Sequence, residues 1–101
     1  MRRADLDACW TAGRRLAARY VDLAWCTNAV GHPRLGVIVP RFQHSAVARN
    51  RVRRRLREIA RRGPLTTLRP VDVLVRARRA AYGAAFTDLR ADLAQALARI
   101  P

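Results

Sequence analysis

The chain has 101 residues, which suffices for one domain and is too short for two. Its 21 basic residues are all arginine and outnumber 7 acidic residues, so the formal net charge at pH 7 is +14. Such a charge destabilises a compact fold through self-repulsion, and an anionic partner relieves it. A polynucleotide is the first candidate partner, and an anionic membrane surface is the second. A hydrophobic fraction of 50% excludes wholesale disorder.

The two cysteines predict free thiols and no metal site. Neither Cys9 nor Cys26 belongs to a CxxC pair, and no metal-ligand spacing connects them with His32 or His44. The N-terminus lacks the apolar run of a secretory signal, and no apolar stretch approaches the roughly 20 residues that span a bilayer. We therefore expect a cytoplasmic protein with no membrane partner.

Three segments have the pattern of strands. Residues 18–27 alternate as a half-buried strand does. One face would carry Val21, Leu23 and Trp25, and the other Tyr20, Asp22 and Ala24. Residues 34–39 are apolar on both faces, which is typical of a central strand, and Pro40 ends them. Residues 71–77 alternate again and predict the third strand.

The first and last segments have the pattern of helices. In residues 5–13, Leu6, Cys9 and Trp10 are spaced as one helical face, and Gly13 supplies a stop. Residues 86–100 carry an apolar stripe, with Thr87 as the expected N-cap. That stripe consists of Leu89, Leu93, Leu97 and Ile100. The order helix, strand, strand, helix, strand, helix predicts an α+β fold with three helices packed on a small mixed sheet.

The remaining helix is strongly basic. Residues 46–62 hold eight arginines and one glutamate, between the expected N-cap Ser45 and the stop signal at Gly63 and Pro64. At 3.6 residues per turn, an apolar stripe forms along one face. The stripe contains Ala48, Val52, Leu56 and Ile59. The opposite ridge contains Asn50, Arg54, Arg57 and Arg61, with Arg51, Arg53, Arg55 and Arg62 on its flanks. Arg49 lies near the apolar edge, where its stem packs on the core while its head reaches outward.

The charges on this helix favour RNA or DNA over a solvated surface or a membrane. A solvated face normally mixes signs so that residues four apart attract one another. Here Glu58 is the only acid, and the ridge arginines repel one another. Membrane-seeking helices offer apolar side chains for insertion, whereas this stripe is only wide enough to seal the domain's own core. Arginines of such a ridge bind phosphates, and Asn50 offers a donor and an acceptor to a base edge or 2′-hydroxyl.

At this point the residues resemble a family. The segment SAVARNRVRRRLRE is similar to the RNR signature of the bacterial ribonuclease P protein component. The matching positions are Arg49, Asn50, Arg51, Arg53, Arg54 and Arg57. The segments DLDACWTAGRR, RLGVIVPRF and VDVLVRA resemble that family's first helix and two of its strands.

The resemblance implies both fold and role. The implied fold is ribosomal protein S5 domain 2-like with a left-handed βαβ crossover, although elementary physics favours the right-handed form. The implied partners are the ribonuclease P RNA, which requires Mg²⁺ and carries catalysis, and the 5′ leader of precursor tRNA. The chain would be a non-catalytic subunit that assists endonucleolytic removal of the leader, with no obligate protein partner.

The resemblance also implies a cleft for the single-stranded leader at Leu6, Trp10, Tyr20, Arg41 and Phe42. Trp10 could stack on a leader base and Leu6 could provide an apolar wall, or both could simply seal the first helix to the sheet. Phe42 could add stacking or cap the core. The family's aromatic residue on the first strand aligns with Ala24, and Tyr20 could compensate from the same face.

The residues predict no active site on the polypeptide. Asp5 and Asp7 are two apart on a short helix and cannot face the same way. Asp88 and Asp92 could, but compensation of the helix N-terminus is the simpler reading. We therefore expect no catalytic residue, metal ion or cofactor on the chain. The alternative function is a structural RNA-binding protein of ribosomal type, which would brace a folded RNA with the same ridge.

Overall fold

The computed structural model describes residues 3–63, 65 and 68–101. In chain order the elements are α1 (Arg3–Ala12), β1 (Arg14–Ala17), β2 (Val21–Thr27), β3 (Arg34–Ile38), α2 (Ala46–Arg62), β4 (Val71–Ala77), the 3₁₀ helix η2 (Arg79–Gly83) and α3 (Phe86–Ala98). The predicted elements are all present, while β1 and η2 were not predicted. Gly63 caps α2 as expected, and Pro64 lies outside the described residues. None of the described helices is long and apolar enough to cross a membrane.

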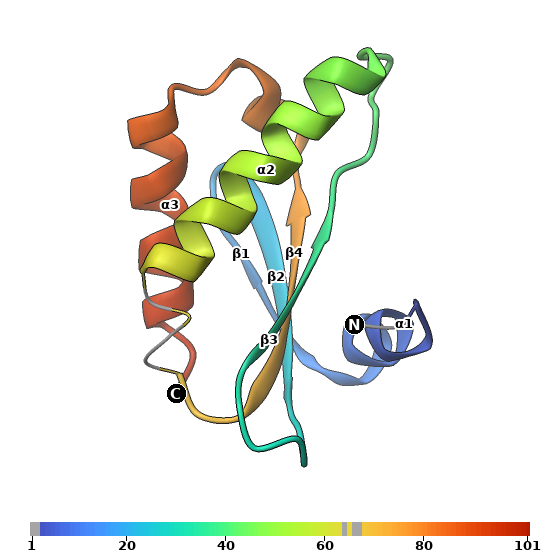
Figure 1. The fold of residues 1–101 in the computed structure, drawn as a ribbon, viewed down its shortest axis with the longest axis vertical. Coiled ribbons are helices and arrows are strands. Elements are labelled where there is room, and N and C mark those ends of the chain that lie inside the picture. Colours follow the sequence, from blue (N-terminus) through green and yellow to red (C-terminus); the bar gives the residue numbers. More distant parts are fainter. Residues whose placement is uncertain (1–2, 64, 66–67) are drawn as a thin grey trace.

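The strands form one mixed sheet in the order β1-β2-β4-β3, with α2 and α3 on one face and α1 on the other (Figure 1). β2 pairs antiparallel with β1 and β4, and β3 pairs parallel with β4. The prediction that β3 is a central strand is wrong, because β3 is an edge. It is apolar on both faces because Leu35 and Val37 pack on the core beneath α2 and α3, while Ile38 packs toward α1.

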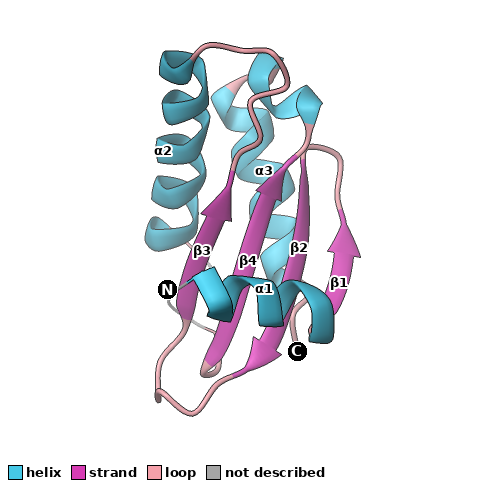
Figure 2. Cartoon of the chain, turned by 90° about the vertical axis from the view of Figure 1, so that its right-hand side faces the viewer, coloured by secondary structure: helices cyan, strands magenta, loops and turns pink. Residues whose placement is uncertain are grey.

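The connection from β3 through α2 to β4 is left-handed, as the family resemblance implies. In Figure 2 both strands point upward, β4 lies to the right of β3, and α2 belongs to the helical layer behind the sheet. When both strands point upward, a crossover whose helix lies behind the sheet and whose second strand lies to the right of the first is left-handed. Most such units are right-handed, so the sequence pattern alone would have given the opposite topology.

The main core lies between the sheet and the helices α2 and α3. Val52, Leu56 and Ile59 of α2 are buried there, which confirms the predicted stripe. The predicted apolar stripe at the C-terminal end is also buried, with Leu89, Leu93 and Leu97 in α3 and Ile100 two residues after its end. The prediction of Thr87 as N-cap is wrong, because Ala85 occupies that position without a side-chain cap. The amides of Asp88 and Leu89 donate to the Ala85 carbonyl, so the helix starts before the hydroxyl residue.

A smaller core attaches α1 to the other face of the sheet. Cys9 is its only buried α1 residue, and it contacts Ala24 of β2 and Leu74 of β4. Gly13 allows α1 to end directly on β2, since an added Cβ would lie 2.4 Å from the Cys9 carbonyl oxygen and 2.6 Å from that of Trp25. Both cysteines are free thiols, as predicted. Burial, together with the neighbouring Cys26, raises the pKa of Cys9 to about 12, so its thiol stays protonated.

The predicted placement of Tyr20 is wrong. The strand was expected to begin at residue 18, which would put Tyr20 on the same face as Ala24, but β2 begins at Val21. The Asp92 carboxylate accepts hydrogen bonds from the backbone amides of Arg19 and Tyr20, at 3.1 and 2.8 Å. These bonds hold the segment against α3, and Tyr20 packs in the main core. Asp92 therefore stabilises the segment that precedes β2 by hydrogen bonds, and does not compensate the N-terminus of its own helix.

A buried carboxylate fixes the start of the parallel pair. Asp72 of β4 accepts two hydrogen bonds of 2.7 Å from Arg34 of β3 and one of 2.9 Å from Asn28. Arg34 and Asp72 are also register partners. The hydrogen bonds from Arg34 hold the pKa of Asp72 below its ordinary value and outweigh the opposite effect of burial. The ion pair thus joins the edge strand to the centre of the sheet.

We expect Asp72→Asn to lower the free energy of unfolding at pH 7 by about 2 to 3 kcal/mol, because hydrogen bonds to a charged group are lost in a buried site. A carboxyl with a lowered folded pKa stabilises the fold above its unfolded pKa of about 4, and that stabilisation disappears as the pH falls through the folded pKa. The difference between the variant and the native chain should therefore shrink in acid, in urea melts at pH 7 and below pH 4. Asp88→Asn, at an exposed position of α3, is the control. A difference that stayed constant with pH would contradict this role of the carboxylate.

Candidate nucleic-acid interface

The outer face of α2 is an exposed row of cations. The Ser45 hydroxyl accepts a hydrogen bond of 3.1 Å from the Ala48 amide and so caps the helix as predicted. Because the apolar stripe faces the sheet, the opposite ridge is directed to solvent. We call this row of four exposed residues the arginine ridge: Asn50, Arg54, Arg57 and Arg61. The structure thus brings together, on one surface, residues that the helical period predicted to be neighbours.

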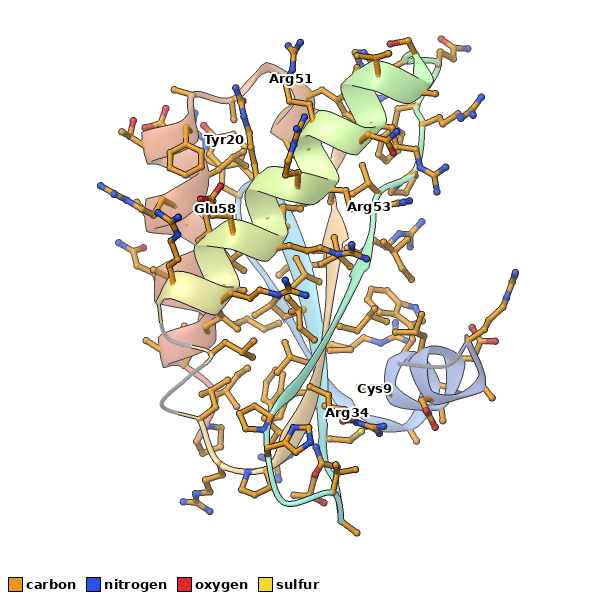
Figure 3. All side chains as sticks on the ribbon, in the orientation of Figure 1. Cys9, Tyr20, Arg34, Arg51, Arg53 and Glu58 are labelled. Atoms are coloured by element: carbon orange, nitrogen blue, oxygen red, sulfur yellow. The ribbon has the colours of Figure 1, made fainter. Side chains whose placement is uncertain are left out.

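Little negative charge accompanies the ridge. Glu58 pairs with Arg62 at 3.2 Å on the flank toward α3, and both side chains are largely exposed. Within the described part of the chain, no ion pair involves Arg54, Arg57 or Arg61. Figure 3 shows the side chains of Arg51 and Glu58 on the outer side of α2. The arrangement leaves the repulsion between these arginines uncompensated, which suits an anionic partner.

On the flank of α2 beside β3, the arginines are half-buried, whereas those of the ridge are exposed. Arg49 donates a hydrogen bond of 2.8 Å from Nε to the Val39 carbonyl, so its stem lies at the core edge as predicted. Arg53, on the same flank (Figure 3), is half-buried. Its Nε atom is fully buried and has no hydrogen-bond partner among the described residues. A buried donor without an acceptor is rare in proteins and carries a free-energy cost.

A hollow of about 310 Å³ lies between α1 and the sheet. Leu6 and Trp10 line it from α1, Ile38 and Pro40 from the end of β3, and Arg76 from β4. Two of the residues predicted for a leader cleft, Leu6 and Trp10, therefore do share one surface, and both are half-buried. We call this feature the α1 hollow.

Guanidinium groups flank the indole at this hollow. The Arg15 guanidinium lies 4.6 Å from the Trp10 ring centroid, and the Arg76 guanidinium lies 5.6 Å from it. Arg15 also donates two hydrogen bonds to the Trp10 carbonyl, of 3.0 and 2.7 Å, from Nε and Nη2. Trp10 is thus part of a cation–π cluster. The sequence analysis did not select these arginines, although the alternation of 71–77 places Arg76 on the same face as Leu74.

The other residues predicted for the leader cleft, Arg41, Phe42 and Tyr20, do not all lie in the same region of the structure. Arg41 and Phe42 follow Pro40 in the chain but do not line the α1 hollow, and the Phe42 ring meets Tyr82 of η2 instead. Tyr20 belongs to the main core on the opposite face of the sheet, and Figure 3 shows it near α3. The proposal that Tyr20 compensates for Ala24 is therefore wrong. Ala24 itself is buried beneath Cys9, so the space of a larger side chain is closed by α1.

Two acidic side chains have clear structural roles. Asp72 binds Arg34, and Asp92 binds two backbone amides. Among the described residues, no group of three or more His, Cys, Asp or Glu side chains is placed to hold a metal ion.

The family model for ribonuclease P matches residues 1–101. The chain belongs to the ribonuclease P protein family. The chain is thus the protein component of an endoribonuclease that acts in tRNA processing. The comparisons do not support the alternative of a ribosomal-type structural protein.

Several ribonuclease P proteins are similar over nearly the whole chain. The protein component of Acidothermus cellulolyticus is 36% identical, over 98% of this chain and 84% of the relative. That of Thermus thermophilus is 40% identical over 84% of this chain, which there corresponds to 49% of the relative's own length.

Solved structures agree on the fold. The ribonuclease P protein of Thermotoga maritima superposes with a TM-score of 0.90 at 28% identity, over 100% of this chain and 96% of the other. The Staphylococcus aureus protein gives a TM-score of 0.87 at 25% identity, over 99% and 94%. This chain thus shares its fold with these two ribonuclease P proteins.

Proposed function

We propose that this ribonuclease P protein docks on the ribonuclease P RNA through the arginine ridge of α2. The observation that carries the proposal is the exposed row of Arg54, Arg57 and Arg61, which has no ion-pair partner among the described residues. Guanidinium groups bind phosphates bidentately. Asn50, in the same row, supplies a donor and an acceptor for a base edge or a 2′-hydroxyl.

Arg49, Arg51 and Arg53 extend the RNA contact to the flanks of the ridge. The guanidinium of Arg49 is anchored at the Val39 carbonyl, so its position is preset. Arg53 lies on the same flank of α2 and is half-buried.

The α1 hollow is the proposed binding site for the precursor tRNA leader. Single strands are held by aromatic platforms with basic neighbours. Trp10 and Arg76 line the hollow, and Arg15 lies over the Trp10 ring. Leu6 provides an apolar wall, and the chain continues past Pro40 into the loop that carries Arg41 and Phe42. A leader contact of this kind would distinguish precursor tRNA from mature tRNA.

The RNA subunit, with its Mg²⁺ ions, would carry the phosphodiester chemistry. The protein would reduce repulsion between crowded phosphates and position the leader, and it would supply no catalytic group. The buried or paired state of Asp72, Asp92 and Glu58 supports this division, because these carboxylates already have structural partners.

Addition of the protein should restore accurate 5′ cleavage of precursor tRNA by a bacterial ribonuclease P RNA at low Mg²⁺, where the RNA alone is inactive. Arginine neutralises phosphates that otherwise need the metal ion for screening. The assay compares cleavage rates with and without protein across a Mg²⁺ titration. Binding to the RNA with no effect on cleavage at any Mg²⁺ concentration would reject the proposed role.

Arg54→Ala should weaken affinity for the RNA subunit and reduce the salt slope of binding by about one unit, because one phosphate contact is lost. Binding isotherms at four or five salt concentrations measure the slope. Arg99→Ala, which removes an exposed arginine at the end of α3, is the matched control and should leave the slope unchanged. Equal slopes for both variants would show that the ridge does not contact phosphate.

Trp10→Ala should weaken holoenzyme binding of precursor tRNA by about 1 to 3 kcal/mol and leave binding of mature tRNA unchanged. The reason is that the Trp10 indole lines the α1 hollow and has two guanidinium groups beside its ring. Kd values for both tRNAs, with circular dichroism to verify folding, decide the matter. An equal loss for both tRNAs would assign Trp10 to packing alone.

A further inference from the structure

The loop between β3 and α2 is held in an unusual conformation. Phe42 and Gln43 have φ angles of 48° and 69°, in the left-handed region that residues other than glycine seldom occupy. Such conformations cost free energy, persist only where neighbouring contacts impose them, and concentrate at functional sites. The amide of His44 donates a hydrogen bond of 2.8 Å to the Arg41 carbonyl and closes the turn.

Tyr82 of η2 is the residue that imposes this loop. Its hydroxyl donates a hydrogen bond of 2.6 Å to the Pro40 carbonyl. Its ring meets Phe42 edge-on, with centroids 6.3 Å apart and planes at 90°. The same ring stacks on His44, with centroids 3.9 Å apart and planes at 6°. The strained loop is therefore shaped so that two of its rings pack on Tyr82. We call Phe42, His44 and Tyr82 the aromatic cluster.

The cluster has the composition of a site for single-stranded nucleic acid. His44 is exposed, and its one ring contact in the described structure is with Tyr82. The imidazole thus ends a stack to which a further flat ring can be added. The Arg79 guanidinium lies 4.9 Å from the Phe42 centroid, and Arg41 is exposed in the same loop. Rings with adjacent arginines are the arrangement by which proteins hold unpaired bases and their phosphates.

The position of the cluster indicates which nucleic acid it meets. Pro40 lines the α1 hollow, and its carbonyl accepts the Tyr82 hydroxyl, so this residue links the hollow to the cluster, whose Tyr82 ring packs on the main core. On its other side, Ser45 begins α2 directly after His44. The cluster therefore lies between the proposed leader site and the proposed docking helix. A strand that leaves the hollow past Pro40 reaches these rings.

We propose that the aromatic cluster is a second stacking site for one unpaired nucleotide of the leader, separate from the site at Trp10. His44 provides the ring on which the base stacks, and Arg79 and Arg41 face the neighbouring phosphates. Tyr82 is a positioning residue, because it holds His44 and Phe42 in place through its ring and its hydroxyl. This inference rests on the proposed binding of the leader.

The test uses holoenzyme reconstituted with a bacterial ribonuclease P RNA. His44→Ala should weaken binding of precursor tRNA roughly 5- to 150-fold, with no change for mature tRNA or for the affinity between protein and RNA subunit. His44→Phe, which keeps a flat ring, should restore precursor binding. His32→Ala is the matched control, since His32 is an exposed histidine in the turn between β2 and β3, and it should behave like the native chain.

Leaders with a single abasic nucleotide locate the site. The effect of His44→Ala should vanish when one particular nucleotide lacks its base, and a different nucleotide should couple to Trp10→Ala. No loss with His44→Ala, or an equal loss for mature tRNA, would overturn the inference. A loss confined to affinity for the RNA subunit would overturn it as well, because the base would then belong to that RNA. Failure of the leader proposal itself is distinguishable: native holoenzyme would not prefer precursor over mature tRNA.

Discussion

Burial of the apolar stripe of α2 is the constraint on which the other features depend. Val52, Leu56 and Ile59 pack against the sheet, and at roughly 1.5 to 3 kcal/mol per buried aliphatic side chain they hold the helix in one rotation. That rotation directs the arginine ridge outward. Eight arginines on one helix oppose its formation through repulsion, so the helix requires the core to keep it folded and an anion to relieve its charge.

The two faces of the sheet serve different purposes. The face under α2 and α3 contains most of the buried residues and provides stability. The face under α1 has a small core centred on Cys9, and a hollow remains open beside it. The thin attachment of α1 leaves room for Trp10 and its guanidinium neighbours at the surface. The main hydrophobic core thus lies on one side of β2 and β4, and the proposed leader site lies on the other.

Local patterns predicted much of this arrangement. The ends of α2, its cap at Ser45, its inward stripe and its outward ridge all follow from helical period and capping chemistry. β1 was missed because four residues, three of them exposed, show no alternation that separates a strand from a loop. β3 was misassigned to the centre of the sheet. Apolar residues on both faces of a strand indicate that both faces are buried, but they do not indicate whether the strand has hydrogen-bonded neighbours on both edges.

The errors at the candidate site have the same origin. Tyr20 was assigned to the α1 face by extending alternation beyond the true start of the strand, where bonds from two amides to Asp92 redirect the chain. The partners of Trp10 were missed because Arg15 and Arg76 come from strands that meet α1 only after folding. The cluster around Tyr82 joins residues about 40 positions apart, as its hydrogen bond to Pro40 shows. No local period connects such positions.

By itself, the sequence determined the class of partner, the basic helix and its two faces, and the family signature, because charge and helical period are properties of neighbouring residues. Only the tertiary structure decided the hand of the crossover, the edge position of β3, the surroundings of Trp10 and the strained loop beneath His44. Those features depend on contacts between distant segments, whose geometry is set by packing on the sheet rather than by any local pattern.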